Sequence, residues 1–120
     1  MSDQRLEDFL EHIRRAASES AAFIEGKERS DFFQSPLVQK AVLMNFVIIG
    51  EAARNIMDRY PEFAEAHPEV PWHGMRGIRN RVTHVYFDVD LDLVWETVKV
   101  HLPRMIARLP DVPKNENKNG

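Results

Sequence analysis

One segment of the chain, residues 71–86, contains the side chains best suited to chemistry on a phosphate group. It holds three arginines, two histidines and no aspartate or glutamate, although acids outnumber lysines and arginines in the whole chain. The five residues are Arg76, Arg79, Arg81, His73 and His84. Arginine stays charged and donates paired hydrogen bonds to phosphate, and histidine exchanges a proton near neutral pH. The segment therefore predicts a cationic site for a phosphate.

Two of these residues could together cleave RNA without a metal ion. Such cleavage requires a group that removes the proton of the ribose 2′-hydroxyl and a cation that stabilises the charge developing on the phosphate. His84 is the candidate acid or base, and Arg79 is the candidate cation. We expect Asn80, Arg76 and Arg81 to support RNA binding. A structural hydrogen bond for Asn80 and a solvated surface position for each arginine remain open alternatives.

The segment 71–86 is expected to form one helix that carries this site. An advance of about 100° per residue puts its apolar side chains on one stripe and its polar side chains on the opposite face. On such a helix Arg79 and His84 are about 140° apart, too far round to act on one atom. A two-fold axis beside the polar face would bring residues of two copies into one cleft, which predicts a homodimer.

The rest of the chain also predicts helices. Apolar periodicity and capping residues place them over residues 3–26, 36–60, 61–66 and 91–109. Asp90 is expected to cap the last of these helices, and Pro103 to kink it. The predicted fold class is all-α, a four- to five-helix antiparallel bundle in one domain, residues 1–109. The polar residues 110–120 are predicted to be a disordered tail.

The predicted helix 36–60 is apolar on nearly all sides over residues 41–49, so neighbouring helices or a second subunit must cover it. Glu51 follows this apolar stretch. A buried carboxylate must be paired, and we therefore expect Glu51 to anchor an arginine, with the motif segment as the candidate source. Trp72 and Trp95 are interpreted as core or interface anchors.

The composition excludes several classes of function. The chain has 120 residues, enough for one domain, and lacks cysteine, which excludes disulfides and thiolate metal sites. Its histidines form no i,i+4 pair, and no metal site or cofactor is predicted. A net charge of −3 argues against a protein that coats nucleic acid generally. The apolar stretch 41–49 is too short to span a bilayer, and the charged N-terminal sequence predicts no signal peptide, so a cytoplasmic location is expected.

The order of these residues resembles the HepT family of HEPN domains. Arg79, His84 and Tyr86 match the R-x4-H-x-Y motif of that family, with an asparagine directly after the arginine. The flanking segments match in the same order, and the likeness covers about residues 6–109. These segments are Gly50-Glu51-Ala52, Val70-Pro71-Trp72, Tyr86-Phe87-Asp88 and Val94-Trp95. The motif alone is weak, but together with the flanking segments it is specific.

The resemblance implies an RNase toxin of a type VII toxin–antitoxin pair. The implied partner is a minimal nucleotidyltransferase antitoxin that transfers AMP to the motif tyrosine, here Tyr86. Family members form homodimers or higher even oligomers in which two motifs meet in one cleft, and tRNA is a candidate target. AMP attached beside Arg79 would bring a fixed phosphate anion into the site meant for the substrate phosphate.

Two other interpretations of the sequence remain open. In the first, the chain is a non-catalytic dimeric binding module that docks a nucleotidyltransferase, and the motif residues serve binding alone. In the second, the chain is a helical structural protein. That interpretation leaves the acid-free polar segment unexplained.

Overall fold

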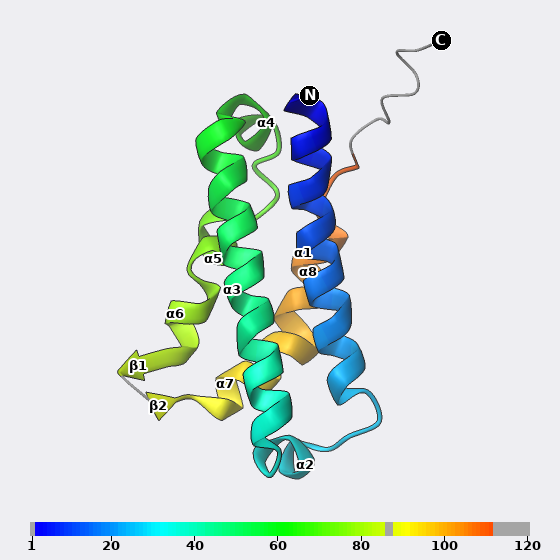
Figure 1. Cartoon of the computed structure of the whole chain (residues 1–120), viewed down its shortest axis with the longest axis vertical. Helices are drawn as coiled ribbons and strands as arrows, with labels where there is room; N and C mark the ends of the chain where they lie inside the picture. The colour runs from blue at the N-terminus through cyan, green and yellow to red at the C-terminus, as the bar shows by residue number, and fades with distance from the viewer. Residues whose placement is uncertain (1, 86–87, 112–120) are drawn as a thin grey trace.

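Two long antiparallel helices form one side of the molecule. The computed structural model describes residues 2–85 and 88–111, without the side chains of residues 2–4, 84 and 85. α1 (Ser2–Ile24) and α3 (Pro36–Arg59) pack along most of their length (Figure 1). The apolar stripe of α1 recurs at helical spacing and is buried at Leu6, Leu10, Ile13 and Ala17. The chain turns after α1 at Gly26, whose positive φ of 76° suits glycine.

The predicted boundaries of the second long helix are confirmed within a residue. The Ser35 side chain accepts a hydrogen bond from the backbone N–H of Val38 at 3.3 Å, and Pro36 occupies the first turn. α3 ends before Pro61, which opens the predicted short helix α4 (Pro61–Ala66). Serine and proline at these positions fix both ends of α3, because each is disfavoured inside a helix.

α3 is the central helix of the fold. It packs against α1 on one side and against two short helices of the motif segment on another. Among the described residues, it is also the one helix long and apolar enough to cross a bilayer by length and composition, and 39% of that apolar window is buried inside the molecule. The core helix of a soluble bundle meets the same criterion.

The last predicted helix is present as one helical segment with a π-helical turn in its middle. It consists of α7 (Leu91–Glu96), the π turn η1 (Thr97–His101) and α8 (Leu102–Ala107). Asp90 caps α7 as predicted, accepting from the backbone N–H of Leu93 at 3.1 Å. The π turn lies just before Pro103, where a kink is expected, because Pro103 cannot donate to the helical ladder.

A short helix that the sequence analysis does not predict follows α1. α2 (Arg29–Phe33) begins with a capping box in which the backbone N–H of Glu28 donates to Asp31 at 2.9 Å. Its Phe32 is fully buried, with its ring centroid 5.8 Å from that of Trp95. The burial of Phe32 stabilises this short helix.

The prediction of one helix over residues 71–86 is wrong. The structure has two short helices, α5 (Trp72–Arg76) and α6 (Ile78–Val82), which meet at Gly77. The chain then enters β1 (Thr83–Val85), which pairs antiparallel with β2 (Asp88–Val89). β-branched residues such as Thr83 favour this extended backbone. The helical-wheel geometry therefore does not apply to His84, which lies on a strand.

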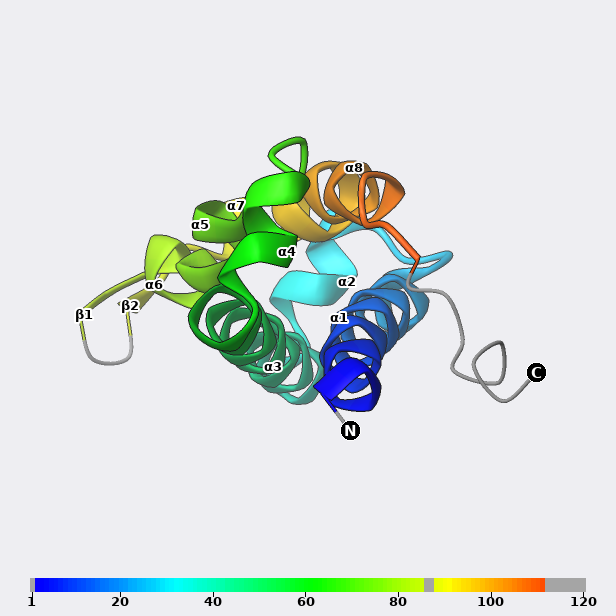
Figure 2. The ribbon, with the colours of Figure 1, turned by 90° about the horizontal axis from the view of Figure 1, so that it is seen from above.

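Residues 112–120, most of the predicted disordered tail, and residues 86–87 lie outside the described part of the chain. In the part that is described, the all-α class is confirmed apart from this hairpin. Seen from above, α1 and α3 lie side by side, and the remaining helices cover the opposite side of the core (Figure 2). The core therefore lies between this helix pair and the α5-to-α8 segment.

Candidate active site

α6 presents three polar residues to solvent and two apolar residues to the core. Ile78 and Val82 are fully buried, four residues apart. Arg79, Asn80 and Arg81 between them are exposed. A helix of five residues has little stability of its own, so the two buried side chains fix its orientation. The three predicted site residues therefore lie on one outward surface.

A close approach between α3 and α5 sets the position of this surface. A Cβ atom built on Gly50 would lie 2.9 Å from the backbone oxygen of Arg76 and 3.3 Å from that of Met75. Only glycine leaves room for the end of α5 at this distance. Gly50 thus brings Arg76, which is exposed, and the start of α6 against the middle of α3.

The β1–β2 hairpin continues directly from α6 and extends away from the bundle in both ribbon views (Figures 1 and 2). Its base is anchored at two points. The Thr83 hydroxyl donates to the backbone oxygen of Arg79 at 3.1 Å, and the backbone N–H of Asp90 donates to the oxygen of Val82 at 2.8 Å. The start of β1 is therefore held to α6 and to the cap of α7.

The predicted catalytic residues lie on different elements. Arg79 lies on α6 and His84 in the middle of β1. The side chain of His84 and the whole of Tyr86 lie outside what the structure describes, so the predicted convergence of these groups with Arg79 remains a prediction. What the structure adds is that His84 lies on a β-strand and not on a continuous helix with Arg79.

No acid among the described residues pairs with the motif arginines. The ion pairs of the described part of the chain lie elsewhere, such as Arg29 with Asp92 at 2.5 Å and Arg14 with Asp111 at 2.9 Å. Arg76, Arg79 and Arg81 are exposed and form no ion pair with these acids. These three guanidinium groups therefore have no intramolecular ion-pair partner among the described residues.

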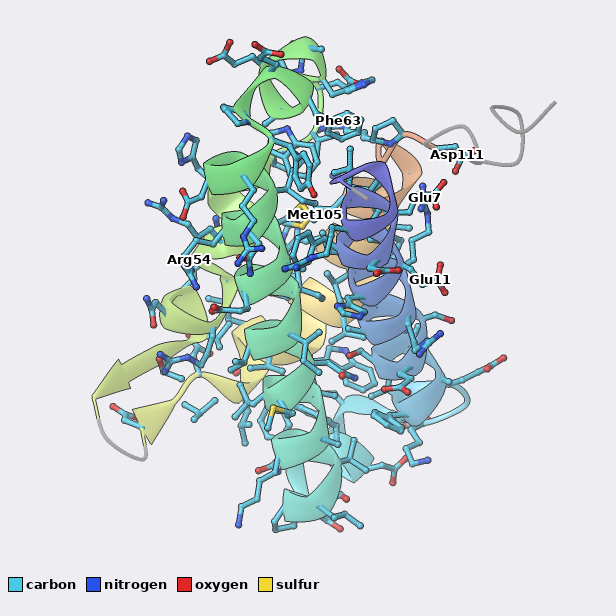
Figure 3. All side chains as sticks on the ribbon, turned by 45° about the horizontal axis from the view of Figure 1, so that its top comes forward. Glu7, Glu11, Arg54, Phe63, Met105 and Asp111 are labelled. Carbon is cyan, nitrogen blue, oxygen red and sulfur yellow. The ribbon has the colours of Figure 1, made fainter. Side chains whose placement is uncertain are left out.

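The expectation for Glu51 is wrong. Its side chain is exposed and pairs with Arg54 of the same helix, which also reaches Asp58 at 3.5 Å. The hydrogen bond and charge of Glu51 raise the pKa of the Arg54 guanidinium. Arg54 is labelled in Figure 3 on α3. A carboxylate at the water-facing side of α3 requires no buried partner, and the position of Glu51 after an apolar run misled the sequence analysis.

The two tryptophans are buried anchors, as predicted. Trp72 at the start of α5 donates its indole N–H to the backbone oxygens of Ala64 and His67, at 3.2 and 3.1 Å. Trp95 packs on Phe32. His73 is exposed beside Trp72. Over the described residues, no group of three or more histidines and acids is arranged to hold a metal ion.

Sequence reasoning missed the positioning role of Gly50, which no catalytic pattern marks. The signal that could have found it is a glycine inside a long apolar helix. Glycine weakens a helix by up to about 1 kcal/mol relative to alanine, so its presence there indicates a close approach of another backbone.

Comparison with known proteins identifies the family of this helical bundle. The family model described as "Ribonuclease HepT-like" matches residues 6–112, nearly the whole chain. The chain therefore belongs to the HepT-like ribonuclease family, as its motif and flanking segments predict.

Three of the similar proteins illustrate the match. A "Probable ribonuclease HepT" of Thermococcus cleftensis is 35% identical over 107 residues, which cover 89% of this chain and 94% of the relative. A "Putative RNase" of Methanocaldococcus jannaschii is 34% identical, covering 88% of this chain and 94% of the relative. A "Putative RNase" of Caldanaerobacter subterraneus subsp. tengcongensis is 31% identical, with 90% and 94% covered. No solved structure matches the chain.

Proposed function

We propose that this chain is a metal-independent endoribonuclease and the toxin of a type VII toxin–antitoxin pair. The single observation that carries the proposal is the outward surface of α6 and the end of α5, where three arginines lie without a paired acid among the described residues. Family membership supports RNA as the substrate, with tRNA as the candidate target. The cytoplasm is the compartment where such a substrate is met.

The proposed reaction is an attack within the RNA itself. His84 takes the proton of a ribose 2′-hydroxyl, and the 2′-oxygen forms a bond to the adjacent phosphorus. The bond from phosphorus to the 5′-oxygen of the next nucleotide breaks, and that oxygen receives a proton from a general acid, which is again His84 or its copy in the second subunit. Arg79 stabilises the additional negative charge on the phosphate. The products carry a 2′,3′-cyclic phosphate and a free 5′-hydroxyl.

A homodimer is part of the proposal, and an apolar stripe on α3 supports it. Leu37 is 80% exposed and Met44 is 60% exposed, and Ile48 continues the same face one turn further on. Val47 borders the stripe and is also exposed. A contiguous apolar stripe on one helix gains free energy when a second surface covers it. A second copy across a two-fold axis would cover this stripe and pair two motif segments, directly or in a higher even oligomer.

The proposed regulation acts on Tyr86. A partner nucleotidyltransferase transfers AMP from ATP to the tyrosine oxygen: a bond forms from that oxygen to the α-phosphorus, pyrophosphate leaves, and the phenol proton passes to solvent. The new phosphate competes with RNA for Arg79. The transfer would therefore block the site and repel RNA at once.

The test is RNA cleavage in excess EDTA, with His84→Ala and Arg79→Ala as the variants. His12→Ala and Arg104→Ala are matched controls, because both residues lie outside the motif segment and Arg104 is exposed. We expect a loss of roughly 10²- to 10⁴-fold for His84→Ala and roughly 10²- to 10³-fold for Arg79→Ala. The controls should cleave like the wild type.

Equal RNA cleavage by the wild type and both motif variants, or no cleavage by any of them, would contradict the proposed ribonuclease activity. Tight binding of a nucleotidyltransferase by an inactive wild type would then favour the alternative, a non-catalytic docking module.

A further inference from the structure

A groove outside the proposed catalytic residues opens where α3 ends, beside α4 and the start of α5. It has a volume of about 650 Å³, within the range of roughly 300–1,000 Å³ that is common for small-molecule sites. Its walls are mainly apolar. They include Met57, Pro61, Pro68, Pro71 and Trp72. The proposed cleavage reaction uses none of these residues.

The floor of the groove is fixed before any ligand binds. Trp72 is only 6% exposed, and its indole N–H already has two backbone acceptors. Phe63, labelled in Figure 3, packs edge-on against it at 6.2 Å between ring centroids (Figure 3). Because the indole N–H is satisfied and little of the ring is exposed, the floor is apolar and offers no free donor, so selectivity must come from the polar groups at the rim.

Two polar side chains, Glu65 and His73, line the groove and are exposed. Glu65 forms no ion pair with the described residues. On the motif side, a Cβ atom built on Gly74 would lie 3.6 Å from the Nη2 atom of Arg81. Gly74 also lines the groove, so the Arg81 guanidinium lies beside this wall, although Arg81 is not itself a lining residue. The apolar groove thus has a carboxylate among its lining residues and a cation beside one of its walls.

We propose that this groove is a nucleobase subsite, that it prefers guanine, and that Arg81 binds the adjoining phosphate. A nucleotide combines a flat apolar ring with an anion, which matches the apolar groove and the cation beside its wall. Guanine presents two adjacent N–H donors on its pairing edge, and these match the two oxygens of the Glu65 carboxylate. Adenine, cytosine and uracil combine a donor with acceptors on that edge, and a carboxylate repels the acceptors. The subsite rests on the proposed ribonuclease function for its natural ligand, RNA.

The test measures binding without cleavage, by NMR of the two indole N–H groups. The full chain is titrated with 5′-GMP, 5′-AMP, 5′-CMP and 5′-UMP. We expect 5′-GMP to shift the Trp72 resonance in a saturable way and to bind about tenfold more tightly than 5′-UMP. Trp95 is the internal control, because it packs on Phe32, away from the groove.

Variants test the base contact of Glu65 and the groove itself. Glu65→Gln should weaken 5′-GMP binding about tenfold, since it removes a charge-assisted pair of hydrogen bonds. Glu62→Gln, on the same helix but outside the groove, is the matched control and should bind like the wild type. Gly74→Leu should fill the groove and abolish the Trp72 shift. If Gly74→Leu does not fold, Glu65→Gln carries the test.

If no nucleotide shifts the Trp72 resonance, the nucleobase subsite is overturned. A protein partner would then be the candidate ligand of the groove. Equal affinity for all four nucleotides, unchanged in Glu65→Gln, would overturn the guanine preference. Because binding is read without cleavage, an inactive chain that binds 5′-GMP would reject the ribonuclease and keep the subsite. A chain that cleaves RNA but whose Trp72 resonance does not shift with 5′-GMP would keep the ribonuclease and reject the subsite.

Discussion

Uncharged residues, as well as the motif, hold the candidate site in place. Gly50 allows two backbones to approach where any side chain would separate them. Asn45 donates to the Ser20 hydroxyl at 3.1 Å between α1 and α3, and both side chains are buried. A buried hydrogen bond of this kind has a modest net value while it is made, but leaving one partner unsatisfied is costly. These contacts set the register of α3 against its neighbours.

We predict that Gly50→Ala destabilises the protein and lowers RNA cleavage. The new Cβ would press on the backbone oxygen of Arg76, and overpacking of this kind costs typically about 1–3 kcal/mol. The higher helix propensity of alanine offsets up to about 1 kcal/mol of this. Urea unfolding measures the difference. Gly74→Ala is the matched control, because its Cβ would meet only ordinary contacts and should leave stability unchanged or raise it.

The Asn45–Ser20 pair gives a second prediction at this scale. Asn45→Ala should lower the free energy of unfolding by about 1–3 kcal/mol, because it strands the buried Ser20 hydroxyl and leaves a small cavity. The double change Ser20→Ala with Asn45→Leu removes both polar groups and fills the space, so it should recover most of the loss. A double variant as unstable as Asn45→Ala would show that the hydrogen bond is not what matters there.

Among the elements, the joint between α6, β1 and α7 decides where the motif lies. α6 is held by two buried side chains, and the hairpin leaves it at Thr83. Asp90 connects the far end of the hairpin to the bundle, through its backbone N–H to Val82 and through its side chain to the first turn of α7. We expect the loss of either contact to loosen the base of the hairpin.

We predict that Asp90→Ala lowers stability by about 0.5–2 kcal/mol, the usual cost of a lost helix cap. Asp90→Asn should lower the stability only slightly, because asparagine caps a helix as well as aspartate does. Thermal unfolding measures both. Glu96→Ala, exposed on the same helix, should behave like the wild type. A larger fall in cleavage than in stability for Asp90→Ala would indicate that the hairpin must be anchored for activity.

At the scale of the whole molecule, one apolar surface is exposed to solvent. The apolar stripe of α3, with Leu37, Met44 and Ile48, faces water in the single chain. The hairpin that carries His84 extends away from the same chain. Both features support the proposed homodimer.

We predict that Met44→Glu converts a dimer into a monomer, because a charge in an apolar interface loses its hydration without gaining a partner. Sedimentation velocity measures the change, and RNA cleavage should fall with the dimer fraction. Val100→Glu is the control: Val100 is also exposed but lies on η1, so this variant should stay dimeric. A dimeric Met44→Glu variant would show that the stripe is not the interface.

The sequence by itself determined the helices that local chemistry can define. Ser35 and the two prolines that open α3 and α4 fix the ends of those helices, and Asp90 fixes the start of α7. The family could likewise be recognised from the sequence, because its motif is defined by the order and spacing of residues. None of these features depends on a distant part of the chain.

Only the tertiary structure decided the shape of the motif segment. Its helical periodicity was real, but the contact of Gly50 with the end of α5 and the pairing of residues 83–85 with 88–89 divide it into two short helices and a strand. The groove above Trp72 is likewise assembled from α3, α4 and α5. The contact of Gly50 and the walls of the groove join residues far apart in sequence, whereas the β1–β2 pairing is local. The free energy of such packing exceeds the small local preferences that a sequence pattern can express.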